Sequence, residues 1–328
     1  MARLKDIAQA SQVSIRTVNR AIKGNGYVDS AVRQRVLHLA KTLGYVPNRT
    51  ARSLSSGKNM DVVALLWGVD ELNMAKLAGL EDPLRSREYQ LNCLFGAPEY
   101  DAAQERILEE LTKRRPAGVA IFSDRYHPER DRAIFRSMLA ANIPYITVDS
   151  HVEGVDSVRI DRSQGVCDAV LHLAASGRQR IAYWGPQEDS TRLVGYLRAM
   201  RQLGRPPLCL MFDPESDMSL WRAQGREIAQ MSPLPDAIQA YSDTTAFALL
   251  AGLYAEGIRV PQQIAVVGFD DRPMAALAWP PLTTVAQPCR AAGAAAAEIL
   301  LRKIAGEPAP TQGWSQTLPT RLVIRESA

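Results

Sequence analysis

The sequence predicts a small all-α head followed by a larger α/β body of two lobes, each a parallel sheet flanked by helices. Helical periodicity fills most of the first 45 residues, whereas from Asp61 short β-rich apolar runs alternate with helical stretches. Charge divides the chain at the same place, because residues 1–60 hold eleven Lys and Arg against two acidic residues. The head therefore has a formal charge of +9 and the remainder −5. This asymmetry favours a polyanion as the head's partner over the alternative of a solvated basic surface.

The first two helices of the head are expected at Leu4–Ser11 and Ile15–Lys23. The first has apolar and small residues at helical spacing, namely Leu4, Ile7, Ala8 and Ser11. Ser14 is a good N-cap for the second, whose inward residues are Val18 and Ile22. The glycines of Gly24–Gly26 end that helix.

The third helix is expected at Ser30–Leu43, with Asp29 as its N-cap and Gly44 after its end. Its inner stripe is Val32, Val36, Leu39, Ala40 and Leu43. Two short helices joined by about three residues, the second with polar outward side chains, form a candidate helix-turn-helix.

The body shows nine strand patterns with helical stretches between most of them. The strands are expected at Val62–Trp67, Gln90–Phe95, Gly118–Phe122, Tyr145–Val148, Ser157–Ile160, Arg180–Trp184, Leu208–Phe212, Ala237–Ala240 and Ile264–Gly268. Typical helical stretches are Ala102–Arg114, Gln164–Ser176, Arg192–Leu203 and Thr244–Glu256. So many strands indicate two sheets, and two facing sheets form a cleft that can close on a ligand.

Several classes of function and location are disfavoured. The chain begins without an apolar leader, and no stretch approaches the roughly 20 apolar residues that span a bilayer. The four cysteines fit no metal spacing and are expected to be reduced and buried in a cytoplasmic protein, and the four histidines do not cluster. A P-loop and a nucleophile-elbow motif are absent from the sequence. We therefore expect no catalytic residue, no metal and no cofactor.

The chain resembles the LacI/GalR family of bacterial repressors along nearly its whole length. In the head the matching motifs are Leu4–Ala8, Val13–Val18, Asn19-Arg20, Leu43–Arg49 and Ala51–Leu54. In the body they are Arg192–Tyr196, Pro235–Ala237, Ile264–Asp271, Pro281–Pro288 and Leu318–Glu326. The resemblance implies a core like that of the periplasmic binding proteins. The chain departs from the family's pattern at Gln12, where many members have Gly. It also departs at Leu66–Met74, which lacks the usual Asn-Pro-Phe-like turn.

Domain limits follow from these patterns and from the resemblance. Residues 1–46 are expected to form the helix-turn-helix domain, 47–60 a hinge helix and linker, and 61–328 the effector-binding and dimerisation core. The N-lobe is expected at about 61–160 and 289–317, and the C-lobe at about 161–288 and 318–328.

Base contacts are expected from the second helix. Ile15, Arg16 and Arg20 match the family's base-reading positions, and Arg can donate two hydrogen bonds to guanine. Ile15 can pack on a thymine methyl group, Asn19 lies on the same outward face, and Thr17 suits a phosphate contact. The alternative for the two arginines is a pair of solvated helix charges.

The hinge should contact DNA as well. Ala51 and Leu54 lie three residues apart on an otherwise polar segment that Asn48 can cap. The resemblance implies that Leu54 enters the minor groove as a wedge, while Arg49 and Arg52 lie near phosphates. Burial in a core is the alternative for this leucine.

The effector site is expected at strand ends. Asp149, Arg192 and Asp270 match the family's polar effector positions, and Ser242 stands where many members have Asn. Trp67, Trp184 and Trp221 are candidates for an apolar face beside a sugar ring. A surface salt bridge for each charged group, or a core position for each tryptophan, is the alternative.

We predict a transcription regulator, most simply a repressor, that binds a pseudo-palindromic operator in double-stranded DNA as a homodimer. A small molecule, a sugar or a sugar derivative, is expected to control it. Two alternatives are a sugar-metabolising enzyme with an accessory DNA-binding head and a sugar-binding transport component. The sequence names neither the effector nor the sign of regulation.

Overall fold

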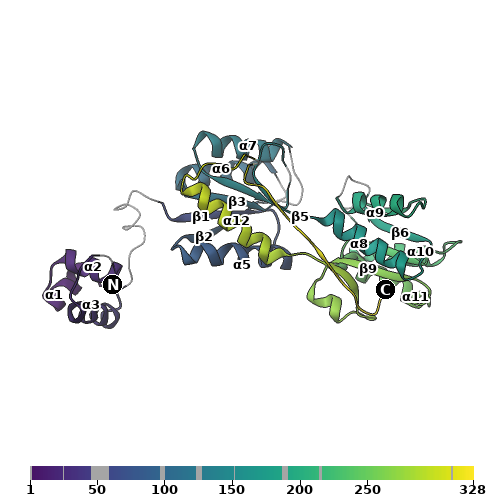
Figure 1. The fold of residues 1–328 in the computed structure, drawn as a ribbon, viewed down its shortest axis with the longest axis horizontal. Coiled ribbons are helices and arrows are strands. Elements are labelled where there is room, and N and C mark those ends of the chain that lie inside the picture. The colour runs from purple at the N-terminus through teal and green to yellow at the C-terminus, as the bar shows by residue number, and fades with distance from the viewer. Residues whose placement is uncertain are drawn as a thin grey trace. The chain divides into compact units, whose positions relative to one another are not determined.

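A computed structural model describes residues 2–24, 26–45, 59–96, 100–122, 128–150, 152–186, 191–213, 216–311 and 313–328. The chain divides into two compact units, Met1–Asn59 and Met60–Ala328 (Figure 1). Each unit has its own hydrophobic core and is described by itself.

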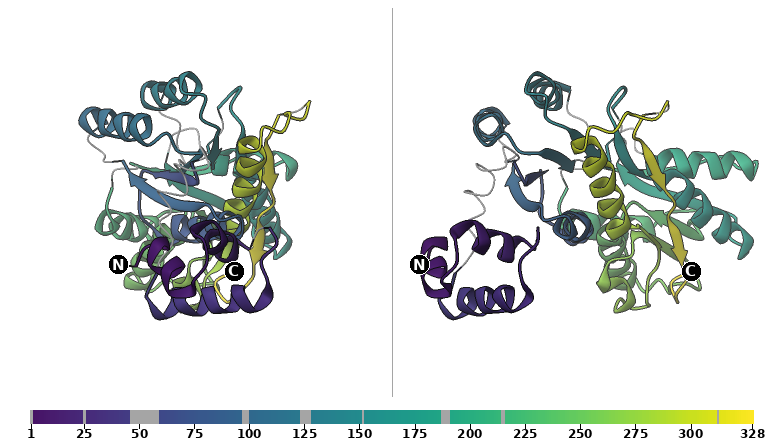
Figure 2. Two further views of the ribbon diagram at one scale, coloured as in Figure 1. Left: turned by 90° about the vertical axis from the view of Figure 1, so that its left-hand side faces the viewer. Right: turned by 60° about the vertical axis from the view of Figure 1, so that its left-hand side comes forward.

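The first unit is a bundle of three short helices, α1 (Leu4–Ser11), α2 (Ile15–Lys23) and α3 (Ser30–Thr42), which Figure 2 shows in two further views. Both predicted caps are confirmed. The Ser14 hydroxyl accepts the Thr17 N–H at 3.0 Å, and the Asp29 carboxylate accepts the N–H groups of Ala31 and Val32. The shared core includes Ile7, Ala8, Val18, Ala21 and Val36.

Gln12 ends α1 with φ 55° and ψ 36°, the left-handed conformation in which glycine is favoured. The backbone N–H of Gln12 still bonds the carbonyls of Ala8 and Gln9. A residue with a side chain therefore closes the turn of the helix-turn-helix at a small conformational cost.

The N-lobe of the second unit is a wholly parallel sheet with strand order β11-β5-β4-β3-β1-β2. Its strands are β1 (Asp61–Leu66), β2 (Gln90–Phe95), β3 (Gly118–Phe122), β4 (Tyr145–Val148), β5 (Ser157–Ile160) and β11 (Gln316–Leu318). Helices α5 (Glu71–Ser86) and α12 (Cys289–Ile304) pack on one core, and α6 (Tyr100–Arg114) and α7 (Pro128–Ala140) on another.

The C-lobe repeats this layering with strand order β12-β10-β9-β8-β6-β7. Its strands are β6 (Ile181–Pro186), β7 (Leu208–Phe212), β8 (Ala237–Ala240), β9 (Ala265–Asp270), β10 (Thr283–Ala286) and β12 (Arg321–Val323). Helices α8 (Arg162–Ala175) and α9 (Thr191–Gln202) pack on one core. Helices α10 (Met218–Ala229) and α11 (Asp243–Ala255) pack on the other, and a short turn of 3₁₀ helix, η1 (Pro273–Ala276), follows β9.

Glycines allow two helix pairs of the body to approach unusually closely. A Cβ on Gly293 of α12 would lie 1.8 Å from the Lys76 carbonyl of α5, and one on Gly195 of α9 would lie 2.2 Å from the Ser163 carbonyl of α8. Only a residue without a side chain fits either place, so these contacts determine where Lys76 and the first turn of α8 lie.

The structure corrects four sequence expectations. Leu43 ends α3 as its C-cap and is 41% exposed, so it is no part of the inner stripe. Cys93 is exposed on the edge strand β2 rather than buried. The two sheets are not both wholly parallel, because β12 runs antiparallel to β10. The short strands β10, β11 and β12 had not been expected, and β11 and β12 are each the edge strand of one sheet.

Within the described part of the chain, every helix is too short or too polar to cross a membrane.

Candidate functional site

The second helix of the head presents a polar face above a buried one. Val18 and Ala21 are at most 2% exposed, whereas Ile15 is 49% exposed and Arg16 and Arg20 are exposed. Ser14 holds the first turn through the backbone of Thr17, and the two hydroxyl groups lie 2.8 Å apart. Three side chains predicted to read bases therefore project from a helix whose start is rigidly capped.

The other two contacts predicted on this helix are less open. Thr17 and Asn19 are each partly exposed. The predicted hinge contacts, Asn48, Arg49, Ala51, Arg52 and Leu54, lie outside the described residues, so the hinge helix and the Leu54 wedge stay predictions.

In the body, two predicted aspartates end strands in opposite sheets. Asp149 follows β4 with φ 78°, and Asp270 is the last residue of β9 with φ 120°. Asp271 also has a positive φ, 52°. Positive φ is strained for residues other than glycine and persists where the surrounding structure imposes it, as it often does at binding sites.

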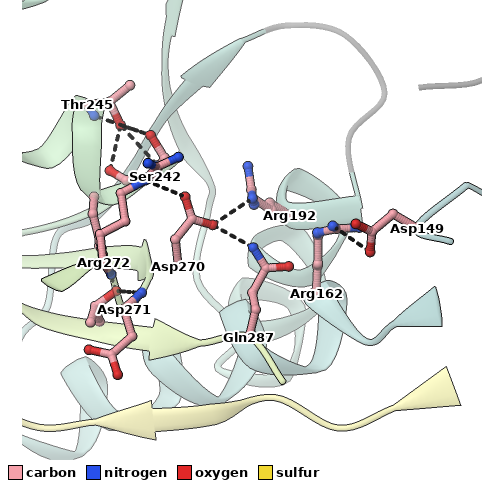
Figure 3. Close-up of polar contacts among 12 residues, drawn as sticks. Asp149, Arg162, Arg192, Ser242, Thr245, Asp270, Asp271, Arg272 and Gln287 are labelled. Carbon is pink, nitrogen blue, oxygen red and sulfur yellow. Dashed lines mark hydrogen bonds and ion pairs between the residues drawn. The ribbon is translucent and has the colours of Figure 1, made fainter. Parts of the chain in front are cut away.

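Asp149 lies between two cations that come from different lobes. The ammonium of Lys76, on α5, donates to one carboxylate oxygen. Arg162 Nη2, on the first residue of α8, lies 3.0 Å from the other oxygen (Figure 3). Burial alone would raise the pKa of Asp149, but Arg162 and Lys76 outweigh it and hold that pKa below its usual value. Asp149 therefore stays ionised although its side chain is only 3% exposed.

Asp270 forms the second buried group, on the C-lobe side. Gln287 Nε2 donates to Asp270 Oδ1 at 2.6 Å, and Arg192 Nη2 donates to the same oxygen at 3.2 Å (Figure 3). Arg272 Nε lies 3.7 Å from the other oxygen. Burial raises the pKa of Asp270, and the neighbouring arginines lower it only in part.

Aromatic rings hold Arg192 in place. Its guanidinium carbon lies 4.2 Å from the ring centroid of Tyr241 and 4.4 Å from that of Phe269. A guanidinium between two rings is oriented by cation–π attraction and has little freedom to move. Arg192 is therefore preorganised to donate hydrogen bonds from a fixed position.

Arg272 links the C-lobe to the start of α5. Its side chain lies 3.5 Å from the carboxylate of Glu71 and 3.7 Å from that of Asp70, which is also the N-cap of α5. The Leu66–Met74 segment, which departs from the family's usual turn, thus supplies acidic groups that contact the opposite lobe.

Asp243 lies beneath these groups and is completely buried. It accepts hydrogen bonds from the Thr284 hydroxyl at 2.5 Å and from the Arg272 backbone N–H at 2.7 Å. Burial raises the pKa of Asp243 to about 7, aided by the nearby Asp270 and Asp271 and opposed by both hydrogen bonds.

Three other residues predicted to bind the effector have structural roles. Ser242 is the N-cap of α11 and exchanges hydrogen bonds with Thr245. Trp221 packs against Phe212 with ring centroids 5.5 Å apart. Trp67 lies against Gly96 and packs on the N-lobe core. Each of these three remains a prediction as an effector contact.

The structure brings Asp149, Arg192 and Asp270 into the region of four residues that the sequence did not single out, namely Lys76, Arg162, Arg272 and Gln287. We call these seven residues the polar cluster. Two of the additions had a detectable signal, because Arg162 and Arg272 follow expected strands closely, whereas Gln287 follows β10, which had not been expected. Lys76 had none, since it lies mid-helix beside apolar residues.

The polar cluster offers hydrogen-bond donors in excess and few acceptors, as a binding site for an oxygen-rich ligand does. The described residues contain no group of three or more His, Cys, Asp or Glu that could hold a metal ion. The side chains of the polar cluster are therefore suited to recognising a ligand through hydrogen bonds and charge.

Comparisons with known proteins agree with both units. Residues 3–48 match the family model for bacterial regulatory proteins of the lacI family, and residues 170–328 match that for a periplasmic binding protein-like domain. The transcriptional regulator CelR of Thermobifida fusca is 33% identical over 344 residues, which cover 99% of this chain and 97% of that protein. The ribose operon repressor of Bacillus subtilis is 31% identical, covering 94% of this chain and 93% of the repressor.

Solved structures extend the similarity to three dimensions. A complex of the transcriptional regulator CelR with cellobiose superposes with a TM-score of 0.71 at 28% identity, and the match covers 100% of both chains.

Proposed function

Since the chain belongs to the LacI family of bacterial regulatory proteins, we propose that it binds a pseudo-palindromic operator as a homodimer in the bacterial cytoplasm, under the control of a sugar or sugar derivative. Its relatives are named transcriptional regulators and repressors, and the chain is accordingly a DNA-binding transcription regulator and not an enzyme. Repression is the most direct outcome, because a dimer on an operator excludes other proteins from that DNA.

The observation that carries the proposal is the outward face of α2. Arg16 and Arg20 are exposed one turn apart on a helix whose opposite face is sealed into the core by Val18 and Ala21. A helix so placed can enter the major groove, where each arginine can donate two hydrogen bonds to a guanine. Ile15 adds an apolar contact suited to a thymine methyl group.

Self-association is supported by an apolar surface on the body. Met274, Leu277 and Trp279 are 55%, 76% and 86% exposed within one short segment around η1. Adjacent exposed side chains of this size favour a protein partner. A second copy of this chain is the partner that a two-fold symmetric operator requires.

Control by a ligand is supported by the ion pairs between the lobes. Asp149 meets Arg162, and Arg272 meets Asp70 and Glu71, so both groups connect strand ends or helix starts of opposite lobes. A ligand bound at the polar cluster would exchange contacts with these groups and favour one arrangement of the lobes. Operator and ligand must then change each other's affinity by the same factor.

The relatives define the first ligands to test. One related structure is a complex with cellobiose, and another relative is named for a ribose operon. These names describe those proteins, and a sugar or sugar derivative is the class that we carry to this chain.

The test begins by selecting bound sequences from a pool of random double-stranded DNA with the full-length chain. We expect a two-fold symmetric consensus. Arg16→Ala should reduce affinity for it by about 1–3 kcal/mol and relax the preference at one position of each half-site.

Lys41→Ala is the matched control, because it also removes one positive charge but from the last turn of α3. It should weaken binding to all sequences alike and leave the consensus unchanged. Selection of no sequence above the starting pool, or an unchanged consensus with Arg16→Ala, would contradict the proposed reading helix.

A further inference from the structure

The polar cluster is more cationic than a site for a neutral sugar needs to be. Within the described residues, the side chains of Lys76, Arg162, Arg192 and Arg272 form ion pairs with two buried carboxylates, those of Asp149 and Asp270. We infer that the effector carries a carboxylate or phosphate group on a hydroxyl-bearing molecule, and that this anion binds against the cations of the polar cluster. The inference rests on the proposed function, in that it describes the effector of the same regulator.

The excess positive charge of the polar cluster is important because the cationic side chains are largely buried. The side chains of Lys76, Arg162 and Arg192 are 5%, 13% and 10% exposed, so water screens them little. Removing cations from water is costly unless they are paired and hydrogen-bonded. An anionic group would complete the pairing that the two aspartates begin.

Hydrogen-bonding capacity leads to the same conclusion. A guanidinium carries five N–H donors and an ammonium three, whereas a carboxylate only accepts. Both oxygens of Asp149 already face cations, one Lys76 and the other Arg162. Asp149 Oδ1 makes no hydrogen bond within the described residues and can still accept one from a ligand hydroxyl group, while the cations beside it keep donors for an anionic group.

The acidic groups around the polar cluster do not neutralise its excess positive charge. Asp70 and Glu71 are 42% and 59% exposed, and of the four cations they contact Arg272, at 3.5 Å or more. Asp271 is paired with Arg325 at 2.7 Å. Asp243 is buried, with a pKa raised to about 7, so near neutral pH it contributes only part of a negative charge.

Arg272 is the cation most available to a ligand. Its three contacts with carboxylates, those of Asp70, Glu71 and Asp270, span 3.5–3.7 Å, which is too long for strong charge-assisted hydrogen bonds. Its buried Nε makes no hydrogen bond within the described residues. A planar carboxylate or a phosphate would be a matching acceptor for such a fork of donors.

The first experiment uses the full-length chain without DNA and inorganic phosphate as the probe. Phosphate should raise the melting temperature above that in chloride at equal ionic strength, because it binds the folded state selectively. Arg162→Gln should abolish most of this increase, while Arg162→Lys, which keeps the charge, should retain it in part.

Arg201→Gln is the matched control, since Arg201 is exposed on α9 and its loss changes net charge equally. It should respond to phosphate as the wild type does. Phosphate can also bind unspecifically to the basic head, but it does so equally in the wild type and in these variants. A difference between them therefore reports on binding to the body. An equal phosphate response in Arg162→Gln and the wild type would overturn the inference.

The second experiment uses isothermal titration calorimetry to compare each neutral sugar with an anionic derivative of it. Ribose 5-phosphate is paired with ribose, and cellobionate with cellobiose, so that the phosphate and carboxylate sources are distinguished. At least one anion should bind tenfold or more tightly than its neutral partner, and Arg162→Gln should remove most of that difference. The inference would be overturned if neither anion bound more tightly than its neutral partner.

These outcomes are independent of the operator selection. Anion binding without a selected DNA consensus would leave the inference standing and contradict the proposed function. A selected DNA consensus together with tighter binding of the neutral sugars would leave the proposed function standing and contradict the inference.

Discussion

Lys76 on α5 donates a hydrogen bond to Asp149 at the end of β4, and both side chains are almost completely buried, at 5% and 3% exposed. The contact depends on the close packing of α5 against α12, where the Lys76 carbonyl lies over Gly293. A buried ion pair of this kind costs desolvation energy, so it adds little net stability and mainly fixes the positions of its two side chains. Here it holds the carboxylate toward Arg162 of the other lobe.

A double-mutant cycle tests this coupling. Asp149→Asn should destabilise the body by about 3–5 kcal/mol, because it leaves Lys76 and Arg162 buried without their counter-ion. The double variant Lys76→Met/Asp149→Asn should lose less than the sum of the single losses, with a coupling energy of about 0.5–3 kcal/mol. Urea unfolding of the full-length chain measures all three variants.

The control cycle uses Asp82 and Arg85, an ion pair of the same helix whose side chains are 45% and 68% exposed. Exposed pairs contribute about 0.2–1 kcal/mol. A coupling for Lys76 and Asp149 no larger than that of the control pair would show that burial adds nothing to this contact.

Asp243 predicts a pH dependence of stability. Its pKa is raised to about 7 in the folded state, whereas an unfolded aspartate ionises near its ordinary pKa of 3.8. Between these values the folded chain holds a proton that the unfolded chain has lost, so the free energy of unfolding falls as pH rises toward 7. Above that range the loss is complete and constant.

Asp243→Asn removes this titration. Between pH 4 and pH 8 the free energy of unfolding of the wild type should fall by a few kcal/mol relative to that of Asp243→Asn. Asp217→Asn, which changes an exposed N-cap into one of equal quality, serves as the control. Parallel pH profiles for the wild type and Asp243→Asn would exclude a raised pKa at this position.

Much of the fold could be predicted because its signals are local. The bounds of α1 and α2 agree with the prediction to the residue, since Ser14 and Gly24 are strong helix boundaries. Most body strands were found because they are buried apolar runs. Strands β11 and β12 were missed because each has only three residues and is stabilised by pairing at a sheet edge, which no local pattern reveals.

The candidate site could be predicted only in part, for a related reason. Asp149 and Asp270 follow buried strands, and the ends of parallel strands are where ligands bind. Lys76 enters the polar cluster because α5 packs closely on a helix more than 200 residues later in the chain, at Gly293. Contacts between such distant segments depend on tertiary packing, and the periodicity of one helix does not show them.

The contact between α5 and α12 should tolerate no side chain at Gly293. Gly293→Ala places a methyl group 1.8 Å from the Lys76 carbonyl, and the backbone must shift to accommodate it. We expect a loss of about 1–3 kcal/mol or more in the free energy of unfolding. Because Lys76 would move, ligand affinity should fall as well.

Gly68→Ala is the control for this substitution, because a Cβ at Gly68 meets nothing within 4 Å. It should be nearly neutral or slightly stabilising. If both variants unfold at the same urea concentration, the close approach of the two helices would not need glycine.

Leu54 supplies the last prediction, which comes from the sequence and concerns a segment outside the described residues. An apolar wedge in the minor groove unstacks a base step, and the bent DNA then contacts more of the protein. Leu54→Ala should therefore weaken operator binding at least tenfold in a fluorescence anisotropy titration, whereas a core leucine would instead lower the melting temperature of the free protein. Unchanged operator affinity would show that Leu54 is no wedge. A lowered melting temperature with unchanged affinity would place it in a core instead.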